Sequence, residues 1–360
     1  MKQTLTILLI CIGFLFRPSS LAQEIAYDIS AAQALAEGFY EEENIQGMSV
    51  AVSIDNELVY SEGFGFTDLD NTIAVEADKT MFRIASLSKP LTSLGLAKLV
   101  ETGKMDFAES FYTYVPDFPK KNYDFTIQQL ASHTAGIRHY KGREGLNNKP
   151  YSIVEGLDLF KDSKLLFEPG SSYKYSTYGW NMISVAMQNA AEMDFEAYMK
   201  EEVLDPLGMN NTLPDKGAYD DLPISGFYVQ NGKGVSSPGP EISIYFKLAG
   251  GGYLSTSEDL VKMGNAMIYE AFLSPETIRK MTTSTTLSSG KTSNYGIGWG
   301  LSTDKDGWLS YSHSGGTVGG VSKLIVYPEQ RAVVAMVANE NCDYVGMGSR
   351  AREIVKALLN

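Results

Sequence analysis

Cysteine and histidine are both scarce in this 360-residue sequence, which has two cysteines and three histidines. Thiolates and imidazoles are the usual ligands of zinc, so this composition leaves little material for a metal site, and we predict no metal and no cofactor. Cys11 and Cys342 lie near opposite ends of the chain. If the segment that holds Cys11 is removed on export, no intrachain disulfide can form. We expect His133 to support a turn and His139 to be exposed.

Basic residues are outnumbered, because 30 Lys and Arg face 43 Asp and Glu and give a formal net charge of -13. A nucleic-acid-binding protein needs a basic surface that displaces counterions from phosphates, so we predict no nucleic-acid partner. Hydrophobic residues make up 44% of the chain, which is enough for a large core and argues against disorder. The length allows two domains, or one large domain with an insertion.

Long hydrophobic runs are absent after residue 22, and the run before it is too short to span a bilayer. Residues 1–22 combine a positive charge at Lys2, an apolar run from Leu5 to Phe16, and small residues before a cleavage point after Ala22. This pattern is typical of a secretory signal peptide, and an uncleaved anchor is the alternative interpretation. We therefore expect a periplasmic or secreted protein with no membrane span after signal cleavage.

Two β-hairpins are predicted near the two ends of the chain. Runs rich in β-forming residues flank short turns in residues 48–60 and again in residues 323–337, whereas helical and irregular segments dominate the middle. Hairpins favour antiparallel pairing. We therefore predict an α+β fold, in which helices flank an antiparallel sheet built from both chain ends. The predicted domains are an α/β domain of residues 23–105 with 240–360 and a mostly helical insertion of residues 106–239.

A candidate nucleophile lies in the motif Ser86-Leu-Ser-Lys89. The residues that follow Pro90 are apolar almost all around a helix, so we predict a buried helix that begins near Ser86. Residues three apart share one helix face, which brings the Lys89 amine towards the Ser86 hydroxyl. A buried lysine can lose its charge and then take the proton that makes a serine nucleophilic. The alternative interpretation is a capping serine beside a surface lysine.

Two further motifs make the pattern more specific. They are Tyr175-Ser-Thr177, and His313-Ser-Gly315 followed by Gly316. In this order the three motifs resemble those of the serine β-lactamase and penicillin-binding protein superfamily, in particular its class C-like branch. They are also similar to the motifs of animal mitochondrial β-lactamase-like serine proteases that form filaments. The resemblance extends over about residues 40–340.

The resemblance implies a role for each motif. Ser86 would attack the substrate carbonyl and become acylated, while Lys89 and Tyr175 would share the proton transfers. The backbone amides of Ser86 and Gly316 would form the oxyanion hole. His313 would hydrogen-bond the catalytic tyrosine or hold a substrate carboxylate. The sequence leaves open whether the lysine or the tyrosine is the acylation base.

The same resemblance places Thr177, Ser314 and Gly315 at the substrate. Thr177 replaces the asparagine that is usual in the family, and His313 replaces the lysine that is usual in penicillinases. Both differences weaken the case for efficient antibiotic hydrolysis. We expect His313 to be partly charged near neutral pH. We also expect a lowered pKa for Tyr175, because two cationic groups would lie beside its phenol.

These predictions together indicate an exported serine hydrolase that acts through a covalent acyl-enzyme on a small peptide-like amide or ester. Its activity would be that of a β-lactamase-related peptidase or esterase. One alternative is a D-alanyl-D-alanine carboxypeptidase that acts on peptidoglycan. The other is a homo-oligomeric filament or scaffold protein that retains a vestigial site.

Overall fold

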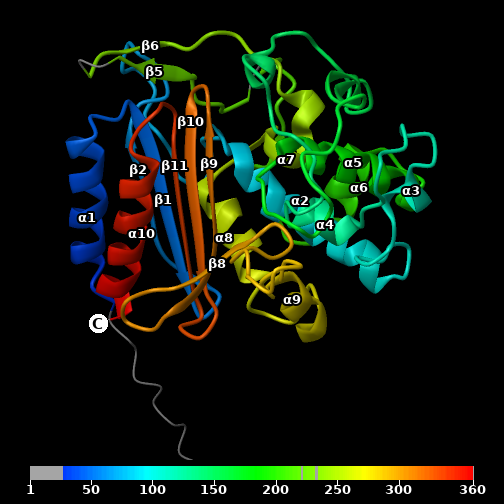
Figure 1. Cartoon of the computed structure of the whole chain (residues 1–360). Helices are drawn as coiled ribbons and strands as arrows, with labels where there is room; N and C mark the ends of the chain where they lie inside the picture. Colours follow the sequence, from blue (N-terminus) through cyan, green and yellow to red (C-terminus); the bar gives the residue numbers. More distant parts are fainter. Residues whose placement is uncertain (1–26, 220–221, 232–233, 360) are drawn as a thin grey trace, which may run out of the picture.

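The structure is a computed structural model that describes residues 27–219, 222–231 and 234–359. The expected signal peptide, residues 1–22, lies outside the described residues. Six antiparallel strands form the main sheet in the order β2-β1-β11-β10-β9-β8 (Figure 1). These strands are β1 (Gly47–Ile54), β2 (Glu57–Gly65), β8 (Gly300–Thr303), β9 (Leu309–Thr317), β10 (Gly320–Tyr327) and β11 (Ala332–Ala338).

The two ends of the chain meet in the centre of this sheet. Strand β1 pairs with β11, so that Met48 lies opposite Ala338 and Ile54 opposite Ala332. The hairpins β1–β2 and β10–β11 lie where the sequence predicts them. The predicted α+β fold with an antiparallel sheet built from both ends is therefore confirmed. The division into an α/β domain and a helical insertion at residues 105 and 240 stays a prediction.

Helices cover both faces of the sheet. Helices α1 (Ile29–Glu42) and α10 (Tyr344–Leu359) lie side by side on one face, and α8 (Ser257–Asn265) lies on the other (Figure 1). Side chains of a strand alternate between the two faces. In β11, Val333 belongs to the core beneath α8 and Val334 to the core beneath α1 and α10. Residues 332–338 are apolar without interruption because both faces are buried.

The helical part of the chain lies beside the sheet (Figure 1). Its central members, α2 (Ser88–Glu101) and α5 (Thr177–Ala191), pack against each other and against α7 (Leu248–Gly251). Helix α2 is buried along almost its whole length, in agreement with its apolar sequence. The shorter helices are α3 (Phe111–Tyr114), α4 (Ile127–Ala131), α6 (Phe195–Met199) and α9 (Pro275–Met281). No helix in the described part of the chain is long and apolar enough to cross a bilayer.

Short strands connect the sheet to the helical part. Strand β7 (Tyr253–Ser255) pairs with both β3 (Phe82–Arg83) and β4 (Leu213–Pro214), and β5 (Tyr228–Gln230) pairs with β6 (Ser236–Pro238). Strand β3 leads directly into a 3₁₀ turn, Ala85–Leu87, and then into α2. The candidate nucleophile Ser86 therefore lies at the junction between the sheet and the helical part.

Candidate active site

Ser86 lies in a 3₁₀ turn that leads directly into the helix predicted to begin near it. The 3₁₀ turn Ala85–Leu87 precedes α2, which begins at Ser88. Ala85 has a φ of 47°, in the left-handed region, where an L-residue is strained by about 1 kcal/mol or more. The Ser88 hydroxyl donates a hydrogen bond to the Ala85 carbonyl at 2.7 Å and holds the turn. Strain of this kind is typical of functional sites, and here it leaves Ser86 partly exposed between buried neighbours.

Two strands fix the backbone that enters this turn. The Ile84 amide donates to the Tyr253 carbonyl on β7 at 3.1 Å. The Ser322 hydroxyl on β10 donates to the Ile84 carbonyl at 2.7 Å. Because the backbone groups of Ile84 are held from both sides, the position of the Ser86 hydroxyl is set by the sheet as well as by α2.

Lys89 is completely buried, and its amine faces Ser86. The Lys89 Nζ lies 3.0 Å from the Ser86 Oγ and also donates to the Gly250 carbonyl. Burial holds the pKa of Lys89 well below its usual value, and the charge of Lys247 lowers it further. No carboxylate in the described part of the chain forms an ion pair with Lys89. A neutral amine in this place has a lone pair that can accept the serine proton.

Tyr175 lies beside the same two groups. The Lys89 Nζ is 4.8 Å from the centre of the Tyr175 ring. The predicted lowering of the Tyr175 pKa is wrong, because burial raises this pKa more than the nearby Ser86 hydroxyl lowers it. The prediction assumed charged neighbours, whereas burial disfavours the charged form of the Lys89 amine. Tyr175 is therefore a neutral phenol that can donate a proton.

All three histidines of the chain surround the Tyr175 ring. Their ring centres lie 4.3 Å (His133), 5.8 Å (His139) and 6.2 Å (His313) from it. His133 has a left-handed φ of 62° and accepts a hydrogen bond from the Ser176 amide, so it supports a turn as predicted. The prediction that His139 is exposed is wrong, since it is half-buried and burial lowers its pKa to about 4. These rings enclose the tyrosine without adding positive charge.

His313 is oriented towards a residue that the sequence analysis did not identify. Its Nδ1 lies 2.7 Å from the Ser314 carbonyl, and its Nε2 lies 2.9 Å from the Tyr295 hydroxyl. Burial lowers the His313 pKa to about 3, so the predicted partial charge is wrong. A neutral imidazole with its proton on Nδ1 accepts the Tyr295 hydrogen bond on Nε2. Tyr295 belongs to none of the three motifs, and only the fold brings it here.

Strand β9 passes directly beside the nucleophile turn. A Cβ atom on Gly315 would lie 2.2 Å from the Ile84 carbonyl oxygen and 3.1 Å from the Ser86 amide nitrogen. Gly316 is exposed, and a Cβ there would meet nothing within 4 Å. The pairing of β8 with β9 ends at Ser312, so the edge of β9 beyond it is free of β8. An extended substrate can lie along such an edge.

Thr177 and Ser314 are held by contacts within the protein. The Thr177 amide donates to the His139 Nδ1 at 3.2 Å at the start of α5, and its side chain lies against Gly250. The Lys323 Nζ lies 3.1 Å from the Ser314 hydroxyl. Both residues are therefore in the neighbourhood of Ser86, while their contact with substrate stays a prediction. No three His, Cys, Asp or Glu side chains among the described residues are placed to hold a metal ion.

The Ser86 hydroxyl lies beside a buried amine whose pKa is lowered, and a phenol and a free strand edge lie close to it. A serine hydrolase that forms acyl-enzymes uses groups of these kinds. The match to known families agrees with this class. The Beta-lactamase family model matches residues 32–359, and the chain belongs to this family. Its type is that of the serine β-lactamases and penicillin-binding proteins.

Two relatives of known sequence illustrate the relationship. The "Serine beta-lactamase-like protein LACTB, mitochondrial" of Homo sapiens is 30% identical over 397 residues, which span 84% of this chain and 72% of the human protein. "Penicillin-binding protein 4*" of Bacillus subtilis is 26% identical over 86% of this chain and 72% of its own length.

Solved structures have the same fold. The octameric penicillin-binding protein homologue from Pyrococcus abyssi has a TM-score of 0.79 at 24% identity, over 92% of this chain and 77% of its own. The D-amino acid amidase from Ochrobactrum anthropi, in a complex with D-phenylalanine, has a TM-score of 0.78 at 20% identity. The likeness covers 92% of this chain and 99% of the amidase chain. At these identities the likeness establishes the fold alone.

Proposed function

We propose that this protein is an exported serine hydrolase that acylates Ser86 with a small peptide-like amide or ester. One observation carries the proposal. The Lys89 amine is buried, has no carboxylate partner among the described residues, and lies 3.0 Å from the Ser86 hydroxyl. Export is proposed from residues 1–22, whose sequence pattern is that of a signal peptide, and it implies a periplasmic or secreted location.

Acylation begins with transfer of the Ser86 proton to the Lys89 amine. The serine oxygen then attacks the substrate carbonyl, and the new C–O bond leaves a negative charge on the carbonyl oxygen. The backbone amides of Ser86 and Gly316 stabilise this oxyanion. Preorganised donors of this kind contribute about 3–4 kcal/mol each to the transition state. The positive end of α2 adds a favourable potential at the same place.

Tyr175 carries the proton to the leaving group. Its neutral phenol donates its proton to the departing nitrogen or oxygen, and the ammonium of Lys89 returns a proton to the phenolate. The acyl-enzyme and a neutral amine remain, so a water molecule can be deprotonated and can release the acid. His313 acts as a positioning residue, because it holds Tyr295 at the wall of the Tyr175 site. Thr177, Ser314 and Gly315 are proposed to line the substrate path.

The names of similar proteins support the proposed substrate class. A D-amino acid amidase and a D-stereospecific amidohydrolase share the fold, and a penicillin-binding protein is among the relatives. Because export would bring the enzyme to the cell wall, terminal D-alanine of peptidoglycan is the second candidate substrate.

The octameric homologue supports a proposed homo-oligomer, which light scattering on a sizing column would test. A filament or scaffold protein would assemble without hydrolytic activity.

A substrate panel tests the proposal. The mature protein is incubated with D- and L-amino acid amides, p-nitrophenyl esters of short acids, a chromogenic cephalosporin and a muropeptide ending in D-alanine. We expect turnover of at least one amide or ester and its loss in Ser86→Ala. Turnover that is equal in Ser86→Ala and wild type would contradict the assignment of Ser86. Release of D-alanine from the muropeptide alone would favour the carboxypeptidase.

A further inference from the structure

A second buried lysine belongs to the segment that holds the Lys89 amine. This segment, residues 245–251, consists of a 3₁₀ turn followed by α7. Its Gly250 carbonyl accepts a hydrogen bond from the Lys89 Nζ. Lys247 precedes Gly250 by three residues, and only 5% of its surface is exposed. The two buried amines are therefore held by one short segment of the chain.

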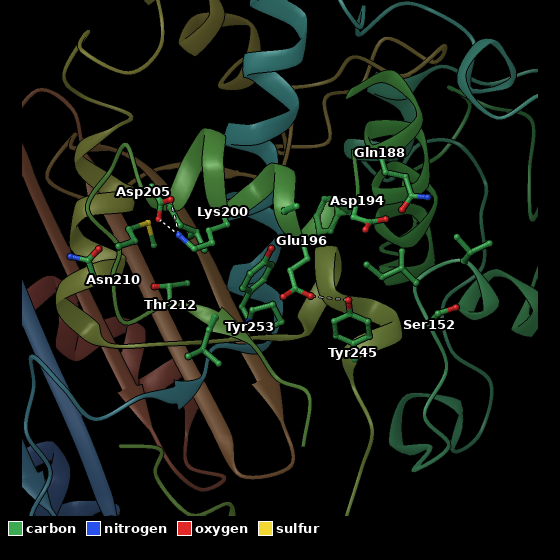
Figure 2. A pocket seen from close by; sticks show the side chains of 18 residues that line it. Ser152, Gln188, Asp194, Glu196, Lys200, Asp205, Asn210, Thr212, Tyr245 and Tyr253 are labelled. Carbon is green, nitrogen blue, oxygen red and sulfur yellow. Dashed lines mark hydrogen bonds and ion pairs between the residues drawn. The ribbon is translucent and has the colours of Figure 1, made fainter. Parts of the chain in front are cut away.

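Lys247 is enclosed by protein and does not line the cavity beside this segment. Figure 2 shows that cavity, which has a volume of about 820 Å³ and is lined by Tyr245 and Tyr253 but not by Lys247. The Lys247 Nζ instead donates a hydrogen bond to the Gly145 carbonyl at 2.8 Å. It also lies 5.2 Å from the centre of the Tyr140 ring. A carbonyl and an aromatic ring thus hold the amine in place.

The Lys247 amine has no acid to neutralise it. No carboxylate forms an ion pair with it in the part of the chain that the structure describes. Asp215 is bound by Arg83 at 2.7 Å, and Glu144 is bound by Arg138 at 2.6 Å. An unpaired charge is costly to bury, and ionisable groups in such surroundings are concentrated at functional sites.

The two buried amines differ in how readily they keep a proton. Burial and the charge of Arg83 lower the pKa of Lys247 to about 8, while Asp215 opposes this shift. Burial holds the pKa of Lys89 well below its usual value, and the charge of Lys247 is the second cause. Near neutral pH, Lys247 is therefore mostly protonated, and its field acts on Lys89.

The other titratable groups around Lys89 bring no positive charge. Tyr175 is a phenol whose pKa is raised by burial. Burial also lowers the pKa values of the surrounding imidazoles, which are those of His133, His139 and His313. His313 stands where penicillinases usually have a lysine, so this position supplies no second cation here. Lys247 supplies that charge from a different element of the fold.

We propose that Lys247 is a positioning residue of the active site, whose positive charge keeps the Lys89 amine free of a proton. A proton on Lys89 would place two ammonium groups in one buried region, where like charges repel more strongly than in water. A lysine next to another cationic group loses its proton more readily and becomes a nucleophile or a base. This role rests on the proposed function, in which Lys89 takes the serine proton.

Removing the charge of Lys247 should change the pH dependence of acylation. In Lys247→Met we expect the pH at which acylation is half lost to rise by about half a unit or more, because Lys89 takes up a proton more readily. Lys247→Gln, which can still donate to the Gly145 carbonyl, should show the same rise. Lys247→Arg keeps the charge and should keep the midpoint of wild type. Stopped-flow acylation of the mature protein with a fluorophosphonate measures these midpoints.

A second measurement follows Lys89 without catalysis. Below the folded-state pKa of Lys89, the folded and unfolded chains both hold its proton, so the stability gained in Lys89→Met is constant there and shrinks at higher pH. When Lys247→Met is added to both proteins, we expect the pH at which this gain begins to shrink to rise by a similar amount. Urea unfolding of each protein at several pH values measures this change.

Lys323→Met is the matched control. Lys323 is a buried lysine on β10, and burial lowers its pKa to about 8 as well. Its charge acts on His313 and is not among the causes that lower the pKa of Lys89. Lys323→Met should therefore leave both pH midpoints unchanged, even if acylation slows because Ser314 loses its contact with the Lys323 amine.

Two results would overturn this role of Lys247. They are unchanged midpoints in both Lys247→Met and Lys247→Gln, and an equal change in Lys323→Met. Acylation by the wild type together with unchanged midpoints would contradict the role of Lys247 alone. A wild type that is not acylated, but whose unfolding midpoint still moves in Lys247→Met, would contradict the proposed function alone.

Discussion

The proposed chemistry depends on the burial of a single side chain. Lys89 is enclosed by α2, α7 and the Tyr175 ring, and the cost of desolvating its charge makes its amine a base. The same burial makes the residue unfavourable for stability, because an unfolded chain would let it take up a proton. Active sites commonly combine function with local instability in this way.

Replacing this lysine should separate function from stability. Lys89→Met should make acylation far slower and raise the free energy of unfolding near pH 7 by about 1 kcal/mol. The folded-state pKa is lowered, so the unfolded chain binds more protons than the folded chain at neutral pH. The gain in stability should shrink as the pH rises towards about 10.4, the pKa of an unfolded lysine. Urea unfolding of Lys89→Met and wild type at several pH values measures this gain in stability.

The exposed Lys104, which follows the end of α2, offers the matched control. Lys104→Met should leave both acylation and the pH dependence of unfolding unchanged. A Lys89→Met protein that is less stable than wild type at every pH would show that the lysine is charged and paired in the folded state.

The pH dependence of acylation should report the same amine. Acylation should be lost as the pH falls through the lowered pKa of Lys89, because a protonated amine cannot accept the serine proton. His313 titrates near pH 3 and should not contribute to this loss. His313→Asn should therefore acylate more slowly but lose activity at the same pH as wild type. Stopped-flow acylation at several pH values measures the pH midpoint of this loss. A midpoint that moves in His313→Asn would assign the titration to the histidine.

At the scale of elements, the contact between β9 and the nucleophile turn should decide activity. Gly315→Ala places a methyl group against the Ile84 carbonyl and should destabilise the protein by about 1–3 kcal/mol and displace the strand from Ser86. Gly316→Ala adds the same methyl group in open space and should change stability by less than about 0.5 kcal/mol. Thermal unfolding and acylation rates of the pair measure the difference. Equal effects of both substitutions would contradict the close approach.

Local spacing explains which parts of the site were predictable. The three-residue interval between Ser86 and Lys89 fixes their proximity in a turn or a helix, and it was read directly from the chain. The environment of Tyr175 depends on segments that are distant in sequence, and so its raised pKa and the contact between His313 and Tyr295 were missed. Burial decides the charge state of every group here, and a motif contains no information on burial.

At the scale of the whole molecule, a buried ion pair joins the short strand β3 to the residue that follows β4, and the same arginine contacts the turn between β9 and β10. Arg83 on β3 contacts Asp215 at 2.7 Å and the Val318 carbonyl at 3.1 Å, and its guanidinium lies 3.6 Å from the centre of the Phe227 ring. Both charged side chains are at most 4% exposed. Removing one partner of such a pair leaves an uncompensated charge.

Asp215→Asn should therefore lower the free energy of unfolding by about 3 kcal/mol. The exposed pair of Asp55 and Arg331 provides a control, since Asp55→Asn should cost less than about 1 kcal/mol. Denaturant unfolding of the two variants tests the difference. A loss of the same size in both would show that the buried pair has no special role.

The fold itself was predictable because its signals are local. Two hairpins with apolar strands and short turns lie near the two ends of the chain, and the helix-rich middle follows from turn signals and apolar spacing. The pairing of β1 with β11 joins residues nearly 300 positions apart. It was inferred as the simplest arrangement of the two hairpins, because no sequence pattern indicates it.

The most direct test of the account is covalent labelling of the mature protein with a fluorophosphonate or a penicillin, followed by peptide mass spectrometry. We expect one label, on Ser86, which disappears in Ser86→Ala and forms far more slowly in Lys89→Met. Labelling of another residue, or a rate that does not change in Lys89→Met, would contradict it.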